Sequence, residues 1–141
     1  MKIKRLNPNT PIPKYANSGD AGLDLCANVE APITIYPGEK VVIGTGIAAE
    51  IPKFHFGLLL PRSGLGTKYD VGLANTAGVI DSAYRQEIKA VVRNRGDNPV
   101  TLQPQERFVQ MIVVPYLHVC IEDSNELEET DRGDGFGSSG K

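Results

Sequence analysis

The chain has 141 residues, of which 40% are hydrophobic and 23% are charged, a size and composition that suit one domain with its own core. Its formal net charge of −2 gives no electrostatic basis for broad, non-specific binding to nucleic acid. No apolar run approaches the roughly 18 residues that span a bilayer, and no signal-peptide segment follows the first five residues, so we expect a cytoplasmic protein.

Short apolar runs bounded by glycine and proline follow one another along the chain, and they predict strands. Residues 41–51 are rich in Val, Ile and Ala, and residues 54–60 form a second apolar run. The one helix candidate is a short turn over residues 63–69. Residues 87–93 alternate apolar and polar positions, whereas residues 107–114 are almost continuously apolar, as in a strand buried on both faces. The pattern predicts an all-β fold, a sandwich or a barrel.

The composition changes near residue 120, where we divide the chain. Residues 1–120 form the predicted β domain, and residues 121–141 are an acidic linker followed by a segment rich in Gly and Ser, which is typical of a flexible arm. The two cysteines, Cys26 and Cys120, lie far apart and lack metal-ligand spacing. We expect both to be reduced, partly buried thiols.

The first polar motif, Ser-Gly-Asp-Ala-Gly-Leu-Asp-Leu, covers residues 18–25 and places two carboxylates in a strand that glycines bracket. One interpretation is a turn in which an Asp accepts local backbone bonds, and the other is a ligand site. The spacing and the closing Glu of a calcium-binding EF-hand are missing.

The second motif, Pro-Arg-Ser-Gly-Leu-Gly-Thr-Lys, covers residues 61–68, directly after an apolar strand. Its backbone N–H groups, hydroxyl and two cations are the groups that an oligophosphate requires. The residue order of a Walker A loop is absent. A solvated turn is the alternative interpretation.

The third motif covers residues 75–85, where an apolar strand delivers Asp81 to a turn and Tyr84 follows three residues later. Asp-Ser also favours a turn without any further role. The fourth motif covers residues 106–111, where Gln110 interrupts an apolar strand. A buried amide needs partners, so Gln110 either contacts a ligand or forms a cross-strand hydrogen bond in the core.

The fifth motif, Arg-Gly-Asp-Gly-Phe-Gly-Ser-Ser-Gly, covers residues 132–140. Many glycine-rich chain ends are disordered linkers. An aromatic residue with an Arg four residues before it favours instead a segment that orders over a ligand, with the ring as a lid and the cation on phosphate.

The order of the five motifs resembles that of the trimeric dUTP pyrophosphatase (dUTPase) family, from about residue 15 to residue 140. The resemblance implies a distorted β-barrel similar to a jelly roll, and a homotrimer in which each active site draws motifs from more than one subunit. It implies hydrolysis of dUTP to dUMP and pyrophosphate, which limits uracil incorporation into DNA and supplies dUMP for dTMP synthesis. Neither direct nucleic-acid binding nor a membrane is expected.

The resemblance also implies roles for residues of the third motif, in a hairpin around residues 75–84. Asn75, Gly78 and Ile80 match the uracil pocket, where backbone groups read the edge of the base. Tyr84 matches a residue whose ring lies beneath the deoxyribose and excludes a 2′-hydroxyl. Asp81 matches the carboxylate that activates the attacking water.

The phosphate and metal contacts fall on the other body motifs. Arg62, Ser63 and Gly64 match phosphate contacts, and Gln110 matches a contact to the α-phosphate. The implied cofactor is Mg²⁺, and Asp24 resembles the carboxylate that holds this hydrated ion through water.

Residues 121–141 are expected to close over an active site, reaching a neighbouring subunit. Phe136 matches the residue that stacks over uracil. Arg132, Gly137 and Ser138 match contacts to the terminal phosphates and the rest of the nucleotide. This chain has one glycine directly before Phe136 where the family usually has two, so the arm is one residue shorter.

Two other functions stay open on the sequence alone. The dCTP deaminases have a related fold, but they need a catalytic Glu near the base and usually have Arg-Ser-Ser in the second motif. Here that motif reads Arg62-Ser63-Gly64, which argues against deamination. The shortened arm motivates the second alternative, a dUTPase scaffold used as a nucleotide-gated switch toward another protein.

Overall fold

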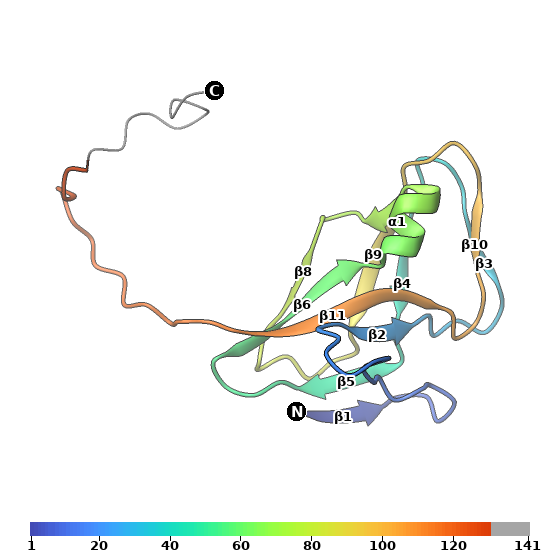
Figure 1. Cartoon of the computed structure of the whole chain (residues 1–141), viewed down its shortest axis with the longest axis horizontal. Helices are drawn as coiled ribbons and strands as arrows, with labels where there is room; N and C mark the ends of the chain where they lie inside the picture. The colour runs from blue at the N-terminus through green and yellow to red at the C-terminus, as the bar shows by residue number, and fades with distance from the viewer. Residues whose placement is uncertain (131–141) are drawn as a thin grey trace.

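The structure is a computed structural model, and it describes residues 1–130 of the chain. The predicted all-β class is confirmed, because these residues form eleven strands and one short helix (Figure 1). In chain order the elements are β1 (Lys2–Arg5), β2 (Leu23–Cys26), β3 (Ile33–Ile35), β4 (Lys40–Gly44), β5 (Ile47–Glu50), β6 (His55–Pro61), α1 (Ser63–Tyr69), β7 (Val71–Leu73), β8 (Gly78–Ile80), β9 (Lys89–Asn94), β10 (Val100–Leu102) and β11 (Arg107–Pro115).

The strands form four antiparallel sheets around one core. The largest has the order β2-β11-β6-β8, a second has the order β4-β9-β7, and β1 pairs with β5 and β10 with β3. Most of these strands have three to five residues. Within residues 1–130 the four sheets do not join into one closed barrel, so the distorted barrel that was expected is an open one.

The predicted strand over residues 41–51 is divided in two. Gly46 lies between β4 and β5 with a φ of 67°, a backbone conformation that favours glycine. On the neighbouring strand the predicted alternation is confirmed, since Ile88, Ala90 and Val92 are buried while Lys89 is exposed.

β11 lies between β2 and β6 and is the longest strand. The prediction that it is buried on both faces is wrong: Phe108, Val109 and Met111 are buried, but Gln110 is only half-buried, and the successive burial of Phe108 and Val109 falls at a register shift in the pairing with β2. Residues 112–114 are partly exposed, because pairing with β2 ends at Met111 and the second half has only β6 beside it.

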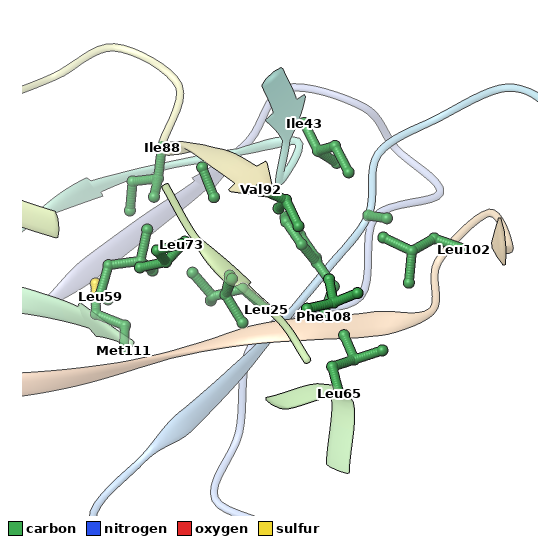
Figure 2. Packing of buried hydrophobic residues seen from close by; sticks show 14 of the residues in the cluster. Leu25, Ile43, Leu59, Leu65, Leu73, Ile88, Val92, Leu102, Phe108 and Met111 are labelled. Carbon is green, nitrogen blue, oxygen red and sulfur yellow. The ribbon is translucent and has the colours of Figure 1, made fainter. Parts of the chain in front are cut away.

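Buried side chains from all four sheets meet in one cluster (Figure 2). Leu25 of β2, Leu59 of β6 and Met111 of β11 pack in it beside residues of β4 and β9. The predicted helix over residues 63–69 is confirmed as α1, and its one buried side chain, Leu65, anchors it to this core.

After β11 the chain leaves the body, and residues 116–130 contain no helix or strand (Figure 1). Both cysteines are free thiols, but Cys120 lies in this segment and is exposed, so only Cys26 is partly buried as predicted. No helix within residues 1–130 has the length and apolar character needed to cross a membrane.

Candidate active site

The predicted site residues within the described part of the chain form two clusters. The first, which we name the phosphate cluster after the role expected of its residues, combines residues from β2, β11 and the start of α1: Asp24, Arg62, Ser63, Gly64 and Gln110. The base cluster consists of residues on and around β8: Asn75, Gly78, Ile80, Asp81 and Tyr84.

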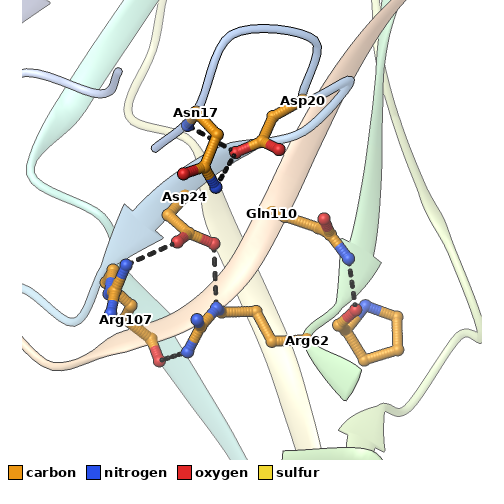
Figure 3. A network of polar contacts seen from close by, with 7 residues as sticks. Asn17, Asp20, Asp24, Arg62, Arg107 and Gln110 are labelled. Carbon is orange, nitrogen blue, oxygen red and sulfur yellow. Dashed lines mark hydrogen bonds and ion pairs between the residues drawn. The ribbon is translucent and has the colours of Figure 1, made fainter. Parts of the chain in front are cut away.

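Asp24 organises the phosphate cluster (Figure 3). Arg62 Nε donates to Asp24 Oδ1 at 2.8 Å, and Arg107 Nη1 donates to Asp24 Oδ2 at 3.1 Å. Arg62 Nη1 also donates to the Arg107 carbonyl at 3.2 Å. A carboxylate shared by two guanidinium groups fixes the direction of both, and the pair leaves a net positive charge available to an anion.

Strand alternation brings these side chains to one face. Leu23 and Leu25 of β2 are buried, so Asp24 between them points away from the core. On β11 Val109 and Met111 are buried, and Gln110 between them points outward in the same way. The sheet that contains β2 and β11 therefore has polar side chains on its outer face, and its inner face packs against the core.

Gln110 is half-buried, and its amide has a partner as predicted. Its Nε2 donates to the Pro61 carbonyl at 3.1 Å, which is the cross-strand bond of the alternative interpretation. Gly22 packs against the amide so closely that a Cβ at this position would collide with Gln110 Oε1. Because Nε2 carries two hydrogens, the bond to Pro61 orients the amide and leaves a second N–H for a ligand.

The remaining residues of the phosphate cluster are accessible. Ser63 and Gly64 lie in the first turn of α1, directly after Arg62, and both are exposed. A Cβ added to Gly64 would meet nothing within 4 Å, so this turn is open to a bulky ligand.

The second carboxylate of the first motif, Asp20, belongs to a local turn. Its Oδ2 accepts from the backbone N–H of Asn17 at 2.8 Å and from Asn17 Nδ2 at 3.2 Å (Figure 3). The turn interpretation thus applies to Asp20, whereas Asp24 lies in the phosphate cluster.

In the base cluster β8 delivers Asp81 to a turn, as predicted. The Tyr84 N–H donates to the Asp81 carbonyl at 3.0 Å, which closes the turn. Tyr84 Oη donates to the carbonyl of Glu87 at 2.9 Å. The turn forms one wall of a cavity of about 190 Å³, whose lining consists of Val79, Ile80, Asp81, Tyr84 and Lys89.

The expected hairpin around residues 75–84 is corrected by the strand pairing. β7 pairs with β9, whereas β8 pairs with β6, so the segment that contains Asn75 connects two sheets. The Leu73 carbonyl accepts a hydrogen bond from the Thr76 N–H at 3.2 Å, which closes a turn after β7. The chain turns there, although β7 and β8 do not pair with each other. Asn75 is exposed there, and Gly78 and Ile80 are half-buried on β8.

The two clusters lie apart within one chain. They lie on opposite sides of β6, because Gln110 pairs with Leu60 from β11, whereas Gly78 and Ile80 pair with Leu59 and Gly57 from β8. β8 runs antiparallel to β6, and Asp81 therefore continues away from the phosphate cluster.

Cys26 lies beside the phosphate cluster. Burial raises the pKa of its thiol, and Asp24 adds to that rise, whereas Arg107 and Arg62 oppose it. A thiol with a raised pKa stays protonated at neutral pH, so Cys26 is not an activated nucleophile.

The donor set suits a hydrated divalent ion rather than an all-protein metal cage. No group of three or more His, Cys, Asp or Glu side chains gathers as a metal site within residues 1–130. Mg²⁺ typically binds proteins through one or two carboxylates and keeps several waters and substrate phosphates as ligands. Asp24 has spare lone pairs on both oxygens beyond its two ion pairs, so it fits contacts to such waters once bound phosphates offset the positive charge of the two arginines.

Three residues with contacts in these clusters were not predicted from the sequence. Arg107 was part of the fourth motif, but only the fold shows that it reaches Asp24. Glu87 bonds Tyr84 through its carbonyl, and Lys89 lines the cavity beside Asp81. The alternating pattern of residues 87–93 predicted a strand and gave no indication that these two residues contact the site.

Four predicted residues of the arm lie outside the described residues. They are Arg132, Phe136, Gly137 and Ser138.

The chain is similar to proteins of one known family over nearly its full length. The sequence profile of the dUTPase family matches residues 8–140. The deoxyuridine 5'-triphosphate nucleotidohydrolase of Acinetobacter baylyi is 46% identical over 140 residues, which cover 98% of this chain and 93% of that protein. The enzyme of the same name from Caldanaerobacter subterraneus is 44% identical over 143 residues, which cover 99% of this chain and 97% of that protein.

Solved structures show the same fold. The dUTPase of Staphylococcus bacteriophage 80alpha with dUpNHpp matches with a TM-score of 0.89 and 26% identity, covering 99% of this chain and 97% of that one. A dUTPase from phage phi11 of S. aureus matches with a TM-score of 0.82 and 21% identity, covering 92% of this chain and 98% of that one. The similarity to relatives extends over nearly the full length of the chain.

Proposed function

The chain belongs to the dUTPase family and is a nucleotide hydrolase that acts on dUTP, and we propose that it works as a homotrimer with Mg²⁺ and active sites shared between subunits. The products are dUMP and pyrophosphate. The observation that carries the proposal is the phosphate cluster, in which Arg62 and Arg107 share Asp24 beside an exposed, glycine-containing turn. Removal of dUTP limits uracil incorporation into DNA, and dUMP is the precursor of dTMP.

The separation of Asp81 from the phosphate cluster supports the proposal of a shared site. A nucleoside triphosphate places its base and its terminal phosphates at opposite ends of one extended molecule. The base cluster and the phosphate cluster of one chain lie on opposite sides of β6. We propose that the phosphate cluster of one subunit faces the base cluster of another, since a closed ring of identical subunits repeats such a contact at each interface.

The phosphate cluster would hold the triphosphate. Arg62 carries the charge, and Asp24 fixes the direction of its guanidinium group. Ser63 and Gly64 supply a hydroxyl and backbone N–H groups from an exposed turn. Gln110 offers its second amide N–H to the α-phosphate while its first stays on the Pro61 carbonyl.

The base cluster would read the nucleoside. Backbone groups of Gly78 and Ile80, with Asn75 beside them, pair with the edge of uracil. Cytosine has an acceptor at N3 and a donor at N4, where uracil has a donor and an acceptor, so it would leave the groups at these positions unpaired. A site built on fixed polar partners rejects such a base strongly. The ring of Tyr84 lies beneath the deoxyribose in this proposal, so a 2′-hydroxyl does not fit.

Asp81 would act as the general base. Its carboxylate is exposed at the end of β8 and lines the same cavity as Tyr84. It accepts a proton from a water molecule as the water oxygen forms a bond to the α-phosphorus. The bond between that phosphorus and the bridging oxygen breaks in line, and pyrophosphate leaves with the electron pair.

A bound Mg²⁺ supplies charge neutralisation across the triphosphate oxygens. Asp24 would hold it through water, because both of its oxygens already accept from Arg62 and Arg107. One structural relative at 21% identity, a variant of the phage phi11 dUTPase, was solved with a structural Mg(II) ion.

Residues 121–141 would form an arm that closes over an active site. In this proposal Phe136 stacks over uracil, and Arg132, Gly137 and Ser138 complete the contacts to the nucleotide. Closure of such a segment excludes water other than the nucleophile and commits the bound substrate.

A substrate panel tests the proposed reaction and its specificity. The purified protein is incubated with dUTP, dCTP, dTTP and UTP, each with Mg²⁺ and with EDTA, and dUMP and pyrophosphate are quantified. We expect release of one pyrophosphate per dUTP, loss of turnover in EDTA, and little product from the other nucleotides. Equal turnover of dCTP or UTP would refute the specificity, and full turnover in EDTA would refute the metal requirement.

A further inference from the structure

Glu87 is a charged residue that has no role in the proposed reaction as described above. It lies between the Tyr84 turn and β9, and its side chain is only 21% exposed. A carboxylate in such a position has lost most of its hydration, so partners in the protein must replace the lost water.

The Glu87 carboxylate binds in the bend between β4 and β5. Glu87 Oε1 accepts from the backbone N–H of Gly46 at 2.9 Å and from Asn28 Nδ2 at 3.5 Å. A side chain on Gly44 would collide with this carboxylate, and Gly46 itself has a φ of 67°. Glycines at both positions therefore make the bend that receives Glu87.

The neighbouring main chain is fixed in the same place. The N–H of Ile88 donates to the Ile47 carbonyl at 2.9 Å, and the N–H of Thr45 donates to the Ile88 carbonyl at 3.1 Å. The side chain of Glu87 and the backbone of Ile88 thus attach this segment to the bend from two sides, which leaves the Glu87 carbonyl little freedom to turn.

That carbonyl contacts the base cluster directly. It accepts a hydrogen bond from the hydroxyl of Tyr84, with the two oxygens 2.9 Å apart, and Tyr84 is 40% exposed, so this bond helps to hold its ring. Glu87 Oε2 also lies 3.6 Å from Lys89 Nζ, and Lys89 lines the cavity that contains Asp81 and Tyr84. The Glu87 residue therefore contacts two residues, Tyr84 and Lys89, that line the proposed sugar site.

We propose that Glu87 is a positioning residue that sets discrimination against ribonucleotides. Its carboxylate, seated in the Gly44–Gly46 bend, fixes the carbonyl that holds the Tyr84 hydroxyl, and so keeps the Tyr84 ring where a 2′-hydroxyl would clash. The inference rests on the proposed function, in which Tyr84 lies beneath the sugar. A purely structural Glu87 would affect stability and would change dUTP and UTP turnover by the same factor.

The test compares kcat/KM for dUTP and for UTP in the full-length protein and in Glu87→Ala, Glu87→Gln and Tyr84→Phe. Glu87→Ala keeps the main-chain carbonyl but removes the carboxylate that helps to hold it in place, so the Tyr84 ring gains freedom to move. We expect the dUTP-to-UTP preference to fall by about tenfold or more, mainly through better use of UTP. Glu87→Gln keeps an oxygen acceptor for the Gly46 N–H and should retain the preference within about threefold.

Tyr84→Phe removes only the hydroxyl and keeps the ring, so it tests the bond to the Glu87 carbonyl even if Glu87→Ala folds poorly. It should lower the preference as Glu87→Ala does, and the double variant should show little further loss, because the carboxylate acts on the Tyr84 ring through this bond. Glu39→Ala is the matched control, since Glu39 Oε2 accepts the Tyr36 N–H at 2.8 Å in a turn remote from both clusters.

The outcomes separate the inference from the proposed function. If the parent protein does not hydrolyse dUTP, the proposed function fails first. If the parent is active and either Glu87→Ala or Tyr84→Phe keeps the parent's preference for dUTP over UTP, the role of Glu87 is refuted. A fall in preference for Glu39→Ala of the same size would show that the effect is not specific to Glu87, and it would also refute the inference.

Discussion

Gln110 and Asp24 are paired residues of β11 and β2, and both side chains point away from the core. The register shifts between Arg107 and Val109, so one extra residue of β11 is accommodated at that point. A bulge of this kind changes the direction of nearby side chains, and here Arg107 reaches Asp24. A local irregularity in the sheet therefore adds a second arginine to the phosphate cluster.

The contact between Gly22 and Gln110 gives the first prediction. Gly22→Ala places a Cβ against Gln110 Oε1, which displaces the amide from its bond to Pro61. We expect kcat/KM for dUTP to fall about tenfold or more, because a small displacement of a contact group costs activity. Steady-state kinetics measure the change. Gly66→Ala is the control, since its Cβ would meet only the Val71 carbonyl at 3.9 Å and Ala favours the helix; a similar loss in both variants would contradict the account.

The shared carboxylate gives a prediction that separates activity from stability. Asp24→Asn removes the charge that both arginines contact, so Arg62 and Arg107 turn away from their positions. Arg62 and Arg107 are 31% and 54% exposed, so the free energy of unfolding should change by less than about 1 kcal/mol. The value of kcat/KM should fall by about 10- to 100-fold. Chemical denaturation and kinetics on one preparation check both, and a stable variant with full activity would exclude this role for Asp24.

Asp81 provides a prediction about the chemical step. Asp81→Asn keeps the size of the side chain and its place at the end of β8, but it can no longer accept a proton from water. Turnover of dUTP should fall by about 10²- to 10⁴-fold, while the affinity for a non-hydrolysable dUTP analogue stays within a few fold. Rapid-quench kinetics and calorimetry give the two values. A variant that turns over dUTP at the parent's rate would remove Asp81 from the mechanism.

The arm is tested by truncation. Removal of residues 132–141 deletes Phe136 and Arg132 and leaves the β domain intact, so we expect the thermal unfolding temperature to stay nearly constant. Turnover of dUTP should fall at least about tenfold, because the site loses its cover. An insertion of one Gly after Gly135, which restores the usual arm length of the family, is the companion variant. Unchanged turnover after truncation would show that the arm has no part in catalysis.

Much of the fold could be predicted from local patterns. The alternation of Ile88, Ala90 and Val92 predicted a half-buried strand, and β9 has that burial. The Pro-Arg-Ser-Gly turn after an apolar run predicted both a short helix and a cluster of phosphate-binding groups, and α1 begins at Ser63.

Pairing between distant strands could not be predicted in this way. The burial of residues 112–114 depends on how far β2 extends along β11, and no feature of β11 itself encodes that length. The predicted hairpin at residues 75–84 was wrong for the same reason, since β7 pairs with β9 and β8 pairs with β6, and both partners are longer strands from other parts of the chain. Glu87 gave no signal because its partners, Gly46 and Asn28, are far from it in sequence.

Complementation between two inactive variants tests most directly the claim that two subunits build each active site. Arg62→Ala disables the phosphate cluster and Asp81→Asn disables the base cluster, and equal amounts of the two chains are unfolded and refolded together. If sites form between subunits, random assembly restores both clusters in about a quarter of the sites, and dUTP turnover should recover to about a quarter of the parent's rate. Turnover that stays at the level of the separate variants, in oligomers shown to contain both chains, would contradict the shared site.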